Sequence, residues 1–225
     1  MTAISREDAS RRVIVDFEGE GEKQGGELPA PILLGALVPD SEGKKVTYHA
    51  WLLDPVLMPV ERAAALDGEC RHRAVATLEE ALGAVLALAD RCRGDLAAFS
   101  NHERRVVEVH CADEDLRTRF LDRLLNIKSR SDRALKKGCP GTGGSLEEQF
   151  QALFPNGTFQ KELEGGAARA CRSLVSTALA ERRWSRWTST QKAVARDLLR
   201  YNRHDCRAAR KVLTKATSIL EADAL

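Results

Sequence analysis

Two acidic residues near the beginning of the chain have the spacing of a metal-binding pair. Asp16 and Glu18 end the apolar segment Val13-Ile-Val-Asp-Phe-Glu18, which we expect to be a β-strand. Because side chains alternate along a strand, both carboxylates would lie on one face, with Phe17 on the other. Paired carboxylates repel each other unless a cation neutralises them, and such groups bind hard ions such as Mg²⁺ or Mn²⁺. The alternative is that both acids are simply exposed to water at the end of the strand.

A third acid, Asp205, lies near the other end of the chain in an unusual position. Tyr201 and Asp205 are four residues apart, so they share one face of a helix. The apolar residues that fall on the same face are Val194, Leu198, Ala208 and Val212. A buried carboxylate needs a cation, a basic side chain or water as a partner, because leaving it unpaired costs on the order of several kcal/mol. One of the nearby arginines could provide that partner in a salt bridge, which is the alternative to a functional role.

The elements that must position these acids follow from the pattern of apolar residues and turn residues. The predicted strands are residues 13–18, 32–38, 46–53 and 96–99, and the predicted helices are residues 77–89, 103–128, 145–154 and 167–220. Thr77 and Glu80 have the spacing of a capping box, and residues 112–115 are a candidate interruption of the long helix. The glycine-rich residues 136–145 predict a flexible connector. They resemble a phosphate-binding loop, but Gly144 stands where that loop requires lysine.

The order β-β-β-α-β-α, followed by further helices, is that of a ribonuclease-H-like fold. In this layout an antiparallel three-stranded meander is extended by a strand that arrives through a helical crossover. We therefore predict one α/β domain over residues 1–225, with a mixed ribonuclease-H-like sheet flanked by helices and a helical C-terminal third. The fold alone would not determine the function.

The motifs at the two ends of the chain together resemble those of the DEDD superfamily of 3′–5′ exonucleases. The DxE of Asp16 and Glu18 is similar to the first motif, and the YxxxD of Tyr201 and Asp205 is similar to the third motif of the tyrosine subgroup. Residues 198–208, Leu-Leu-Arg-Tyr-Asn-Arg-His-Asp-Cys-Arg-Ala, resemble the closing helix of a bacterial and archaeal branch that occurs alone or fused to helicase and nuclease modules. The resemblance covers nearly the whole chain in order, although only the end motifs are specific.

The middle motif of the superfamily departs from its usual form. Phe99-Ser-Asn-His-Glu103 stands where N-x-x-(F/Y)-D is usual, so the resemblance assigns Glu103 to the metal site in place of aspartate. Ser100 and Glu103 also have the spacing of a capping box, in which Glu103 would bond only the start of a helix. Asp122 is the substitute candidate for the fourth acid.

The resemblance implies a metal-dependent nuclease that hydrolyses phosphodiester bonds of DNA or RNA with two Mg²⁺ or Mn²⁺ ions, as a 3′–5′ exonuclease. The residues that would bind metal are Asp16, Glu18, Glu103 and Asp205, and Tyr201 would orient the attacking water. The alternative is a non-catalytic module of the same fold that binds nucleic acid or a protein. A helicase or another nucleic-acid-processing protein is the expected kind of partner.

The charge distribution is compatible with a nucleic-acid ligand. The net charge is +2, but residues 1–60 carry 6 Lys and Arg against 10 Asp and Glu, whereas residues 166–215 carry 13 against 3. The basic region over residues 167–220 could contact phosphates, although basic helices are also commonly just solvated. Trp184 and Trp187, among arginines, could stack on bases or pack in the core.

The composition predicts a folded, cytoplasmic protein without a membrane segment. Apolar residues make up 43% of the chain and charged residues 30%. The longest apolar stretch, residues 81–89, is too short to span a bilayer, and the charged N-terminus does not resemble a signal peptide. The 6 cysteines contain no CxxC pair, which favours reduced thiols over disulfides or a zinc site.

Overall fold

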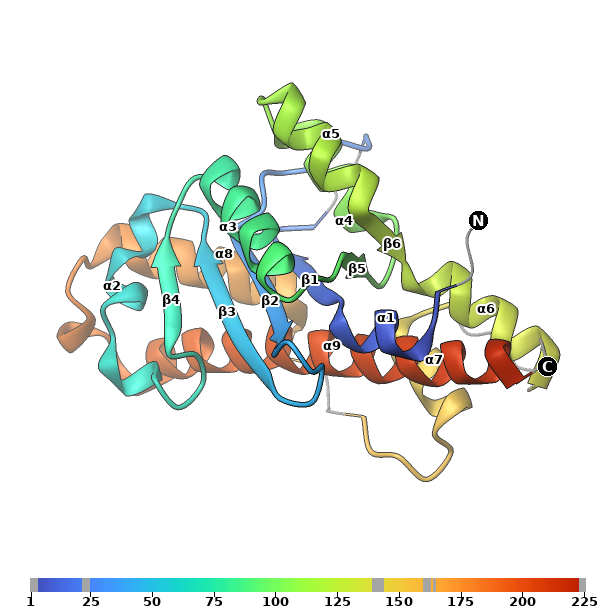
Figure 1. The fold of residues 1–225 in the computed structure, drawn as a ribbon. Coiled ribbons are helices and arrows are strands. Elements are labelled where there is room, and N and C mark those ends of the chain that lie inside the picture. Colours follow the sequence, from blue (N-terminus) through green and yellow to red (C-terminus); the bar gives the residue numbers. More distant parts are fainter. Residues whose placement is uncertain (1–3, 22–24, 139–143, 160–162, 164, 223–225) are drawn as a thin grey trace.

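A six-stranded mixed sheet forms the centre of the molecule, and helices pack on both of its faces (Figure 1). The computed structural model describes residues 4–21, 25–138, 144–159, 163 and 165–222. The strands are β1 (Val13–Glu18), β2 (Leu33–Pro39), β3 (Val46–Leu52), β4 (His72–Val75), β5 (Leu96–Ala98) and β6 (Leu124–Asn126). The architecture is therefore α/β, as predicted.

The strands are arranged in the order β4-β3-β2-β1-β5-β6. The pairs β1/β2 and β2/β3 are antiparallel, whereas β3/β4, β1/β5 and β5/β6 are parallel. Strand β2 thus runs against its neighbours, and β1 lies in the interior of the sheet between β2 and β5. A side chain at the end of β1 is consequently surrounded by protein on both sides.

The helices divide into two groups, one for each face of the sheet. One face is covered by α3 (Leu78–Arg91), α4 (His102–His110) and α5 (Glu114–Arg123), and the other by α1 (Arg6–Arg11), α6 (Ile127–Gly138), α7 (Leu146–Leu153), α8 (Gly166–Ala180) and α9 (Ser189–Ala222). Val13, Val15 and Phe17 of β1 pack in the first core, and Ile14 packs in the second. By alternation, Asp16 and Glu18 lie on the face of Ile14, toward α9.

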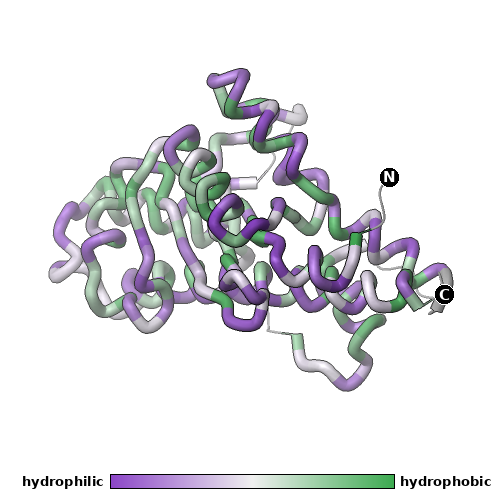
Figure 2. The backbone as a smooth tube through the Cα atoms, in the orientation of Figure 1, coloured by the Kyte–Doolittle hydropathy of each residue, from purple (hydrophilic) through white to green (hydrophobic). Residues whose placement is uncertain are grey.

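Helix α9, 34 residues long, crosses the sheet and contacts β1 and β2 as well as α1, α6, α7 and α8 (Figure 1). Its buried residues include Leu198, Ala208 and Val212, so the core-facing stripe predicted from the sequence is confirmed. Figure 2 shows the hydrophobic residues gathered along the strands and the hydrophilic segments at the periphery. Asp205 therefore lies on the side of α9 that packs against the sheet.

Several predicted elements are confirmed by the structure. The three strands of the meander and the strand at residues 96–99 are present as β1, β2, β3 and β5. Thr77 caps α3 in the expected capping box with Glu80, and the short helix after residue 145 is α7. The sequence analysis did not predict α1, β4 or the short helices between β3 and β4, which are η1 (Pro55–Leu57), α2 (Met58–Glu61) and η2 (Ala64–Leu66).

The predicted helix over residues 103–128 is interrupted within the candidate break at residues 112–115, as expected, but the prediction of helix over residues 124–126 is wrong, because these residues form a strand. Helix α4 ends at His110, and Asp113 begins α5 by accepting a hydrogen bond from the backbone N–H of Leu116. The next residues form β6, which pairs with β5, so the tertiary pairing overrides the helical propensity of its leucines. Helix α6 then extends to Gly138, into the predicted connector, and residues 139–143 of that connector lie outside the described residues.

The C-terminal third is helical but not continuous, in contrast to the prediction over residues 167–220. Helix α8 ends at Ala180, and the single turn η3 (Trp184–Arg186) precedes α9. Trp187 is buried in this break, where its indole N–H donates to the carbonyl of Glu181 over 2.8 Å. Of the two predicted roles, stacking on bases or packing in the core, Trp187 has the packing role, because its ring is buried in the core.

None of the helices in the described ranges combines the length and the apolar character needed to cross a membrane. The cysteines within these ranges are Cys70, Cys92, Cys111, Cys171 and Cys206, and all of them are buried without a disulfide. They act as small apolar side chains in the cores. Cys139 lies outside the described residues.

Candidate metal centre

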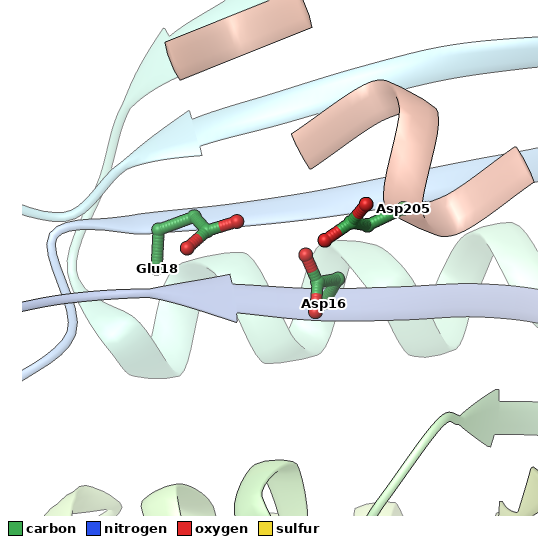
Figure 3. A group of neighbouring side chains, drawn as sticks. All are labelled: Asp16, Glu18 and Asp205. Carbon is green, nitrogen blue, oxygen red and sulfur yellow. The ribbon is translucent and has the colours of Figure 1, made fainter. Parts of the chain in front are cut away.

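Three carboxylates from the two ends of the chain meet between β1 and α9. Asp16 and Glu18 extend from one face of β1, and Asp205 extends toward them from the core-facing side of α9 (Figure 3). One carboxylate oxygen from each of them lies within 4.8 Å of the others. The alternation of β1 and the helical stripe of α9, both predicted from the sequence, produce this convergence.

A pocket of about 320 Å³ opens over these carboxylates at the end of β1. All five site residues predicted from the sequence contribute to its wall: Asp16, Glu18, Glu103, Tyr201 and Asp205. The remainder of the wall comes from the segments that follow β1, from the start of α4 and from the first turn of α8. Residues far apart in the sequence are therefore collected at one point.

Glu103 lies in the first turn of α4 with 4% of its surface exposed. Its Oε2 atom accepts hydrogen bonds from the backbone N–H and the hydroxyl of Ser100, at 3.3 and 3.2 Å. The hydroxyl of Ser100 accepts from the N–H of His102 instead of that of Glu103, so the arrangement is only half of a capping box. Glu103 thus holds the start of the helix and lines the pocket at the same time.

The alternative fourth acid, Asp122, is far less suited to the pocket. Its side chain is exposed on α5, and it does not contribute to the pocket wall. Glu103 is close enough to Asp16 for their charges to affect each other. Among these two candidates, the geometry favours Glu103.

Asn202 is a site residue that the sequence analysis missed. It is completely buried on α9, and its amide nitrogen donates to Asp16 Oδ2 at 2.7 Å and to Glu18 Oε1 at 3.3 Å. Its amide oxygen accepts from the hydroxyl of Tyr48 on β3 at 2.7 Å. Asn202 therefore fixes two of the carboxylates, and Tyr48 fixes the orientation of Asn202.

Gly35 makes room for this amide. It lies opposite Asp16 in the pairing of β1 with β2, and a Cβ atom placed on it would lie 1.6 Å from Asn202 Oδ1. No side chain larger than hydrogen fits at that distance. The signal for Asn202 in the sequence was its helical spacing with Leu198, Leu199 and Cys206, which are all buried.

Three acids of the pocket, Asp16, Glu18 and Glu103, have raised pKa values. Burial, followed by the charge of Glu18, raises the pKa of Asp16 well above its usual range. Burial likewise raises the pKa of Glu18 to about 8 and that of Glu103 to about 7. Burial, followed by the charge of Asp205, also raises the pKa of Tyr201, so its phenol remains protonated at neutral pH.

The pocket lacks the basic counter-charge that would make these acids purely structural. Among the described residues, no lysine or arginine forms an ion pair with Asp16, Glu18, Glu103 or Asp205. Arg200 and Arg203 on the same helix instead bind Glu69, at 2.6 and 3.1 Å. Within the described ranges, the basic group that approaches Asp205 is His204, with 3.7 Å between Nδ1 and Oδ1. The predicted alternative of an arginine salt bridge to Asp205 is therefore absent from the described residues.

The residues present fit a hard divalent cation. Asp205 Oδ1 is buried and has no hydrogen-bond partner among the described residues. This oxygen atom could therefore bind a cation without breaking a hydrogen bond within the protein. The pocket offers only oxygen ligands at its acidic end, which is the ligand type that Mg²⁺ and Mn²⁺ prefer. Binding of such an ion would relieve the repulsion that raises the pKa of Asp16.

Comparison with known proteins does not identify a relative: no family model, no curated protein and no solved structure matches the chain. The functional conclusion must therefore come from the residues of the pocket and their geometry.

Proposed function

We propose that this protein is a metal-dependent nuclease that hydrolyses phosphodiester bonds of DNA or RNA as a 3′–5′ exonuclease of the DEDD type, with tyrosine in its third motif. The observation that carries the proposal is the pocket itself. Four carboxylates and a phenol from β1, α4 and α9 line one cavity, and no arginine or lysine among the described residues neutralises the acids. Such a site suits a reaction in which metal ions and a polyanionic substrate supply the missing charges.

The topology supports a ribonuclease-H-like fold. Strands β1, β2 and β3 form an antiparallel meander, and β5 joins β1 in parallel after the crossover through α3. The antiparallel meander and the parallel addition of β5 beside β1 are the features that support this part of the proposal. Strand β4 extends the sheet beyond β3, and the meander remains intact beside it.

The four acids have distinct positions relative to the metal ions. Asp16, Glu18 and Asp205 form the compact group that would hold one ion, and Glu103, which interacts with Asp16, would help to hold a second. Asp16 would contribute to holding both ions, since it belongs to the group with Glu18 and Asp205 and its charge also interacts with that of Glu103. Bound Mg²⁺ or Mn²⁺ would lower the pKa of a water molecule and stabilise the negative charge on the leaving oxygen.

Tyr201 would act as a hydrogen-bond donor rather than as a base. Its pKa is raised above the usual value near 10 by burial and by Asp205, so it retains its proton. A protonated phenol in the pocket wall can donate to a water molecule or to a phosphate oxygen and orient it. Asn202 complements this role by fixing Asp16 and Glu18 through its amide N–H groups.

The surroundings of the pocket support a nucleic-acid substrate. The C-terminal third, which contributes Tyr201 and Asp205, is the basic part of the chain, with 13 Lys and Arg over residues 166–215. Cations of this kind bind phosphate backbones without regard to base sequence. A helicase or another nucleic-acid-processing protein that supplies or consumes strands is the kind of partner that such an activity implies.

Cleavage of end-labelled substrates tests the proposal. DNA and RNA oligonucleotides with a label at either the 5′ or the 3′ end are incubated with the protein in Mg²⁺, Mn²⁺ or a chelator. We expect stepwise shortening from the 3′ end that requires the divalent ion and is abolished in Asp16→Asn. Tight binding of these oligonucleotides without turnover in Mn²⁺ would show instead that the protein is a non-catalytic binding module.

A further inference from the structure

A groove runs along α9, separate from the pocket that Asp16, Glu18, Glu103, Tyr201 and Asp205 line, which we call the metal pocket. It has a volume of about 870 Å³ and lies between α9, α7 and the turn that joins β2 to β3. His204 lines this groove, whereas the next residue, Asp205, lines the metal pocket. From His204 to Ser218 the groove follows α9 for roughly 21 Å at about 1.5 Å per residue. It is therefore long enough for several nucleotides.

One wall of the groove carries a row of exposed cations. Arg207, Lys211 and Lys215 are spaced at intervals of four on α9, so they lie along one side of the helix. None of these three forms an ion pair with a carboxylate of the described residues. Other arginines of α9 are engaged: Arg200 and Arg203 bind Glu69, and Arg210 donates to the carbonyls of Ser10 and Gly43. The row of Arg207, Lys211 and Lys215 is thus available to an anionic ligand in the groove.

The floor of the groove is apolar and aromatic. Phe150 and Phe154 of the α7 region contribute to it, with ring centroids 4.9 Å apart, and Val46 contributes from β3. The ammonium group of Lys211 lies 5.7 Å from the centre of the Phe150 ring. Phe154 is only half-buried, so part of its ring faces the groove. Proteins bind single-stranded nucleic acids with cations that contact the phosphates and with aromatic rings that stack on the bases.

We infer that this groove binds single-stranded nucleic acid and leads it to or from the metal pocket. The inference rests on the proposed nuclease function for its purpose, although the binding itself does not require cleavage. A duplex would offer phosphates to the cations, but its paired bases could not reach the apolar floor. A purely acidic peptide such as polyglutamate would likewise leave the aromatic floor unused. The groove thus favours an unpaired strand, whose charges and bases it can bind together.

Binding measured in a chelator tests this inference without any contribution from catalysis. The probes are fluorescent dT and rU oligomers of about 20 nucleotides, the matching duplex, and polyglutamate as a competitor, with fluorescence anisotropy as the readout. In Arg207→Ala/Lys211→Ala/Lys215→Ala we expect the affinity for the single strands to fall at least tenfold. The slope of log affinity against log salt should fall by about 2, since each lost phosphate contact contributes about 0.7.

A matched control removes the same charge elsewhere. Arg62, Arg71 and Arg119 are exposed on other elements, and their triple alanine variant should bind within about twofold of the parent. Phe154→Ala should weaken binding of the single strand about fivefold or more without changing the salt slope, because it removes stacking and not charge. Circular dichroism verifies that each variant is folded.

The inference is overturned if the parent does not bind the strands, if the groove variant binds as well as the parent, or if the control variant weakens equally. Stronger binding of the duplex, or equal competition by polyglutamate, would also exclude it. These results are distinguishable from failure of the nuclease proposal. A protein that binds single strands through the groove but cleaves none retains this inference and loses the proposed function.

Discussion

Two carboxylates at α9, Glu69 packed against the helix and Asp205 on it, have opposite surroundings. Glu69 and Asp205 have similarly buried side chains, with 13% and 16% of their surfaces exposed. Glu69 is bound by Arg200 and Arg203, and its hydrogen bond with Arg200 lowers its pKa. Asp205 faces Asp16 and Glu18, whose pKa values are raised, and one of its oxygens has no hydrogen-bond partner among the described residues.

Arginines are present on α9, but Arg200 and Arg203 form ion pairs with Glu69 and not with the acids of the pocket. Arg200 and Arg203 lie within one turn or so of Asp205 along α9, yet they point to Glu69. A carboxylate that serves only folding is stabilised by such pairs, as Glu69 is. The pocket retains repulsion that makes the metal-free protein less stable and that a bound cation would remove. The following predictions test this contrast.

The largest effect is expected from Asp205→Asn, which keeps the shape of the side chain and removes its charge. If Asp205 binds the proposed metal ion, its loss removes several kcal/mol of stabilisation from the transition state, so the proposed cleavage activity should fall about a thousandfold or more. The free energy of unfolding in chelator should rise, by about 1 kcal/mol, because a repelling charge is lost. Single-turnover cleavage and urea denaturation measure the two effects.

Full activity in Asp205→Asn would remove Asp205 from the metal site. A loss of stability in chelator would contradict the idea that the charge of Asp205 is uncompensated. The matched control is Asp197→Asn, which removes a half-exposed carboxylate from the same helix and should leave cleavage within about twofold.

Gly35→Ala should give the second-largest effect through Asn202. The new Cβ atom would overlap the amide oxygen of Asn202, so the amide must move away from Asp16 and Glu18. Overpacking of this kind destabilises a protein by about 1 to 3 kcal/mol, and misplaced ligands should reduce cleavage on the order of a hundredfold. Thermal unfolding and cleavage rates measure the change.

Gly83→Ala is the control for glycine replacement. Gly83 lies within α3, and a Cβ atom there would meet nothing within 4 Å. Alanine is the better helix former, so this variant should be about 0.5 to 1 kcal/mol more stable and fully active. If Gly35→Ala behaved in the same way, Asn202 would have no role in holding the acids.

Gly35 and Asn202 also mark the limit of what the sequence could predict. Asp16, Glu18 and Asp205 were predictable because each depends on local periodicity, the alternation of a strand or the repeat of a helix. The role of Asn202 depends on three contacts made at once with β1, β2 and β3, and no spacing within α9 encodes them. The ion pair between Arg200 and Glu69, which are 131 residues apart in the chain, also depends on tertiary contacts and could not be predicted from spacing.

The elements with clear local sequence patterns were predicted, and those that depend on tertiary contacts were missed. The meander and the helix capped by Thr77 have clear alternation and a capping box, and both are present. Strand β6 was missed because its three residues continue a helical pattern, and only pairing with β5 makes them a strand. The break before α9 was missed because Trp184 and Trp187 have helical spacing, while burial of Trp187 stabilises the turn between the helices.

The stability of the metal-free protein should fall as the pH rises. The pKa of Glu18 is raised to about 8 and that of Glu103 to about 7, from a usual value of 4.5, so both take up protons on folding. Their contribution to stability is complete below pH 4.5 and is lost as the pH rises through 7 and 8. Between about pH 6 and about pH 9 the loss should be on the order of 4 kcal/mol, of which Glu18 contributes the larger part.

The Glu18→Gln variant isolates this effect, since it should show a smaller loss over the same range of pH. The increase in melting temperature on addition of Mg²⁺ or Mn²⁺ should grow with pH in the parent, because the metal binds the ionised acids. Glu69 behaves oppositely, because its hydrogen bond with Arg200 lowers its pKa below the usual 4.5. Its contribution to the free energy of unfolding is therefore present above pH 4.5 and is lost only as the pH falls into the acid range. Identical pH profiles for the parent and Glu18→Gln would contradict the prediction.

Tyr201→Phe should have a smaller effect on catalysis than loss of a carboxylate. The phenol keeps its proton and would contribute one hydrogen bond, so its removal should slow cleavage about tenfold, equivalent to about 1.4 kcal/mol. The melting temperature increase with Mg²⁺ should be unchanged, because no metal ligand is lost. If this variant were as inactive as Asp16→Ala in the same assay, Tyr201 would have a more direct part in the reaction.

Glu69→Gln should give the smallest effect and completes the comparison with Asp205. It removes the charge that binds Arg200 and Arg203, and the lost charge-assisted hydrogen bonds should lower the free energy of unfolding by about 1 to 2 kcal/mol. Cleavage should remain within about twofold of the parent, since Glu69 does not line the metal pocket. Neutralising Glu69, which binds arginines of α9, and neutralising Asp205, which lies on α9, would then change stability in opposite directions in chelator, a result that similar burial alone could not produce. A gain of stability in Glu69→Gln, measured by urea denaturation, would show that the arginine pair is not stabilising and that the two regions do not differ as inferred.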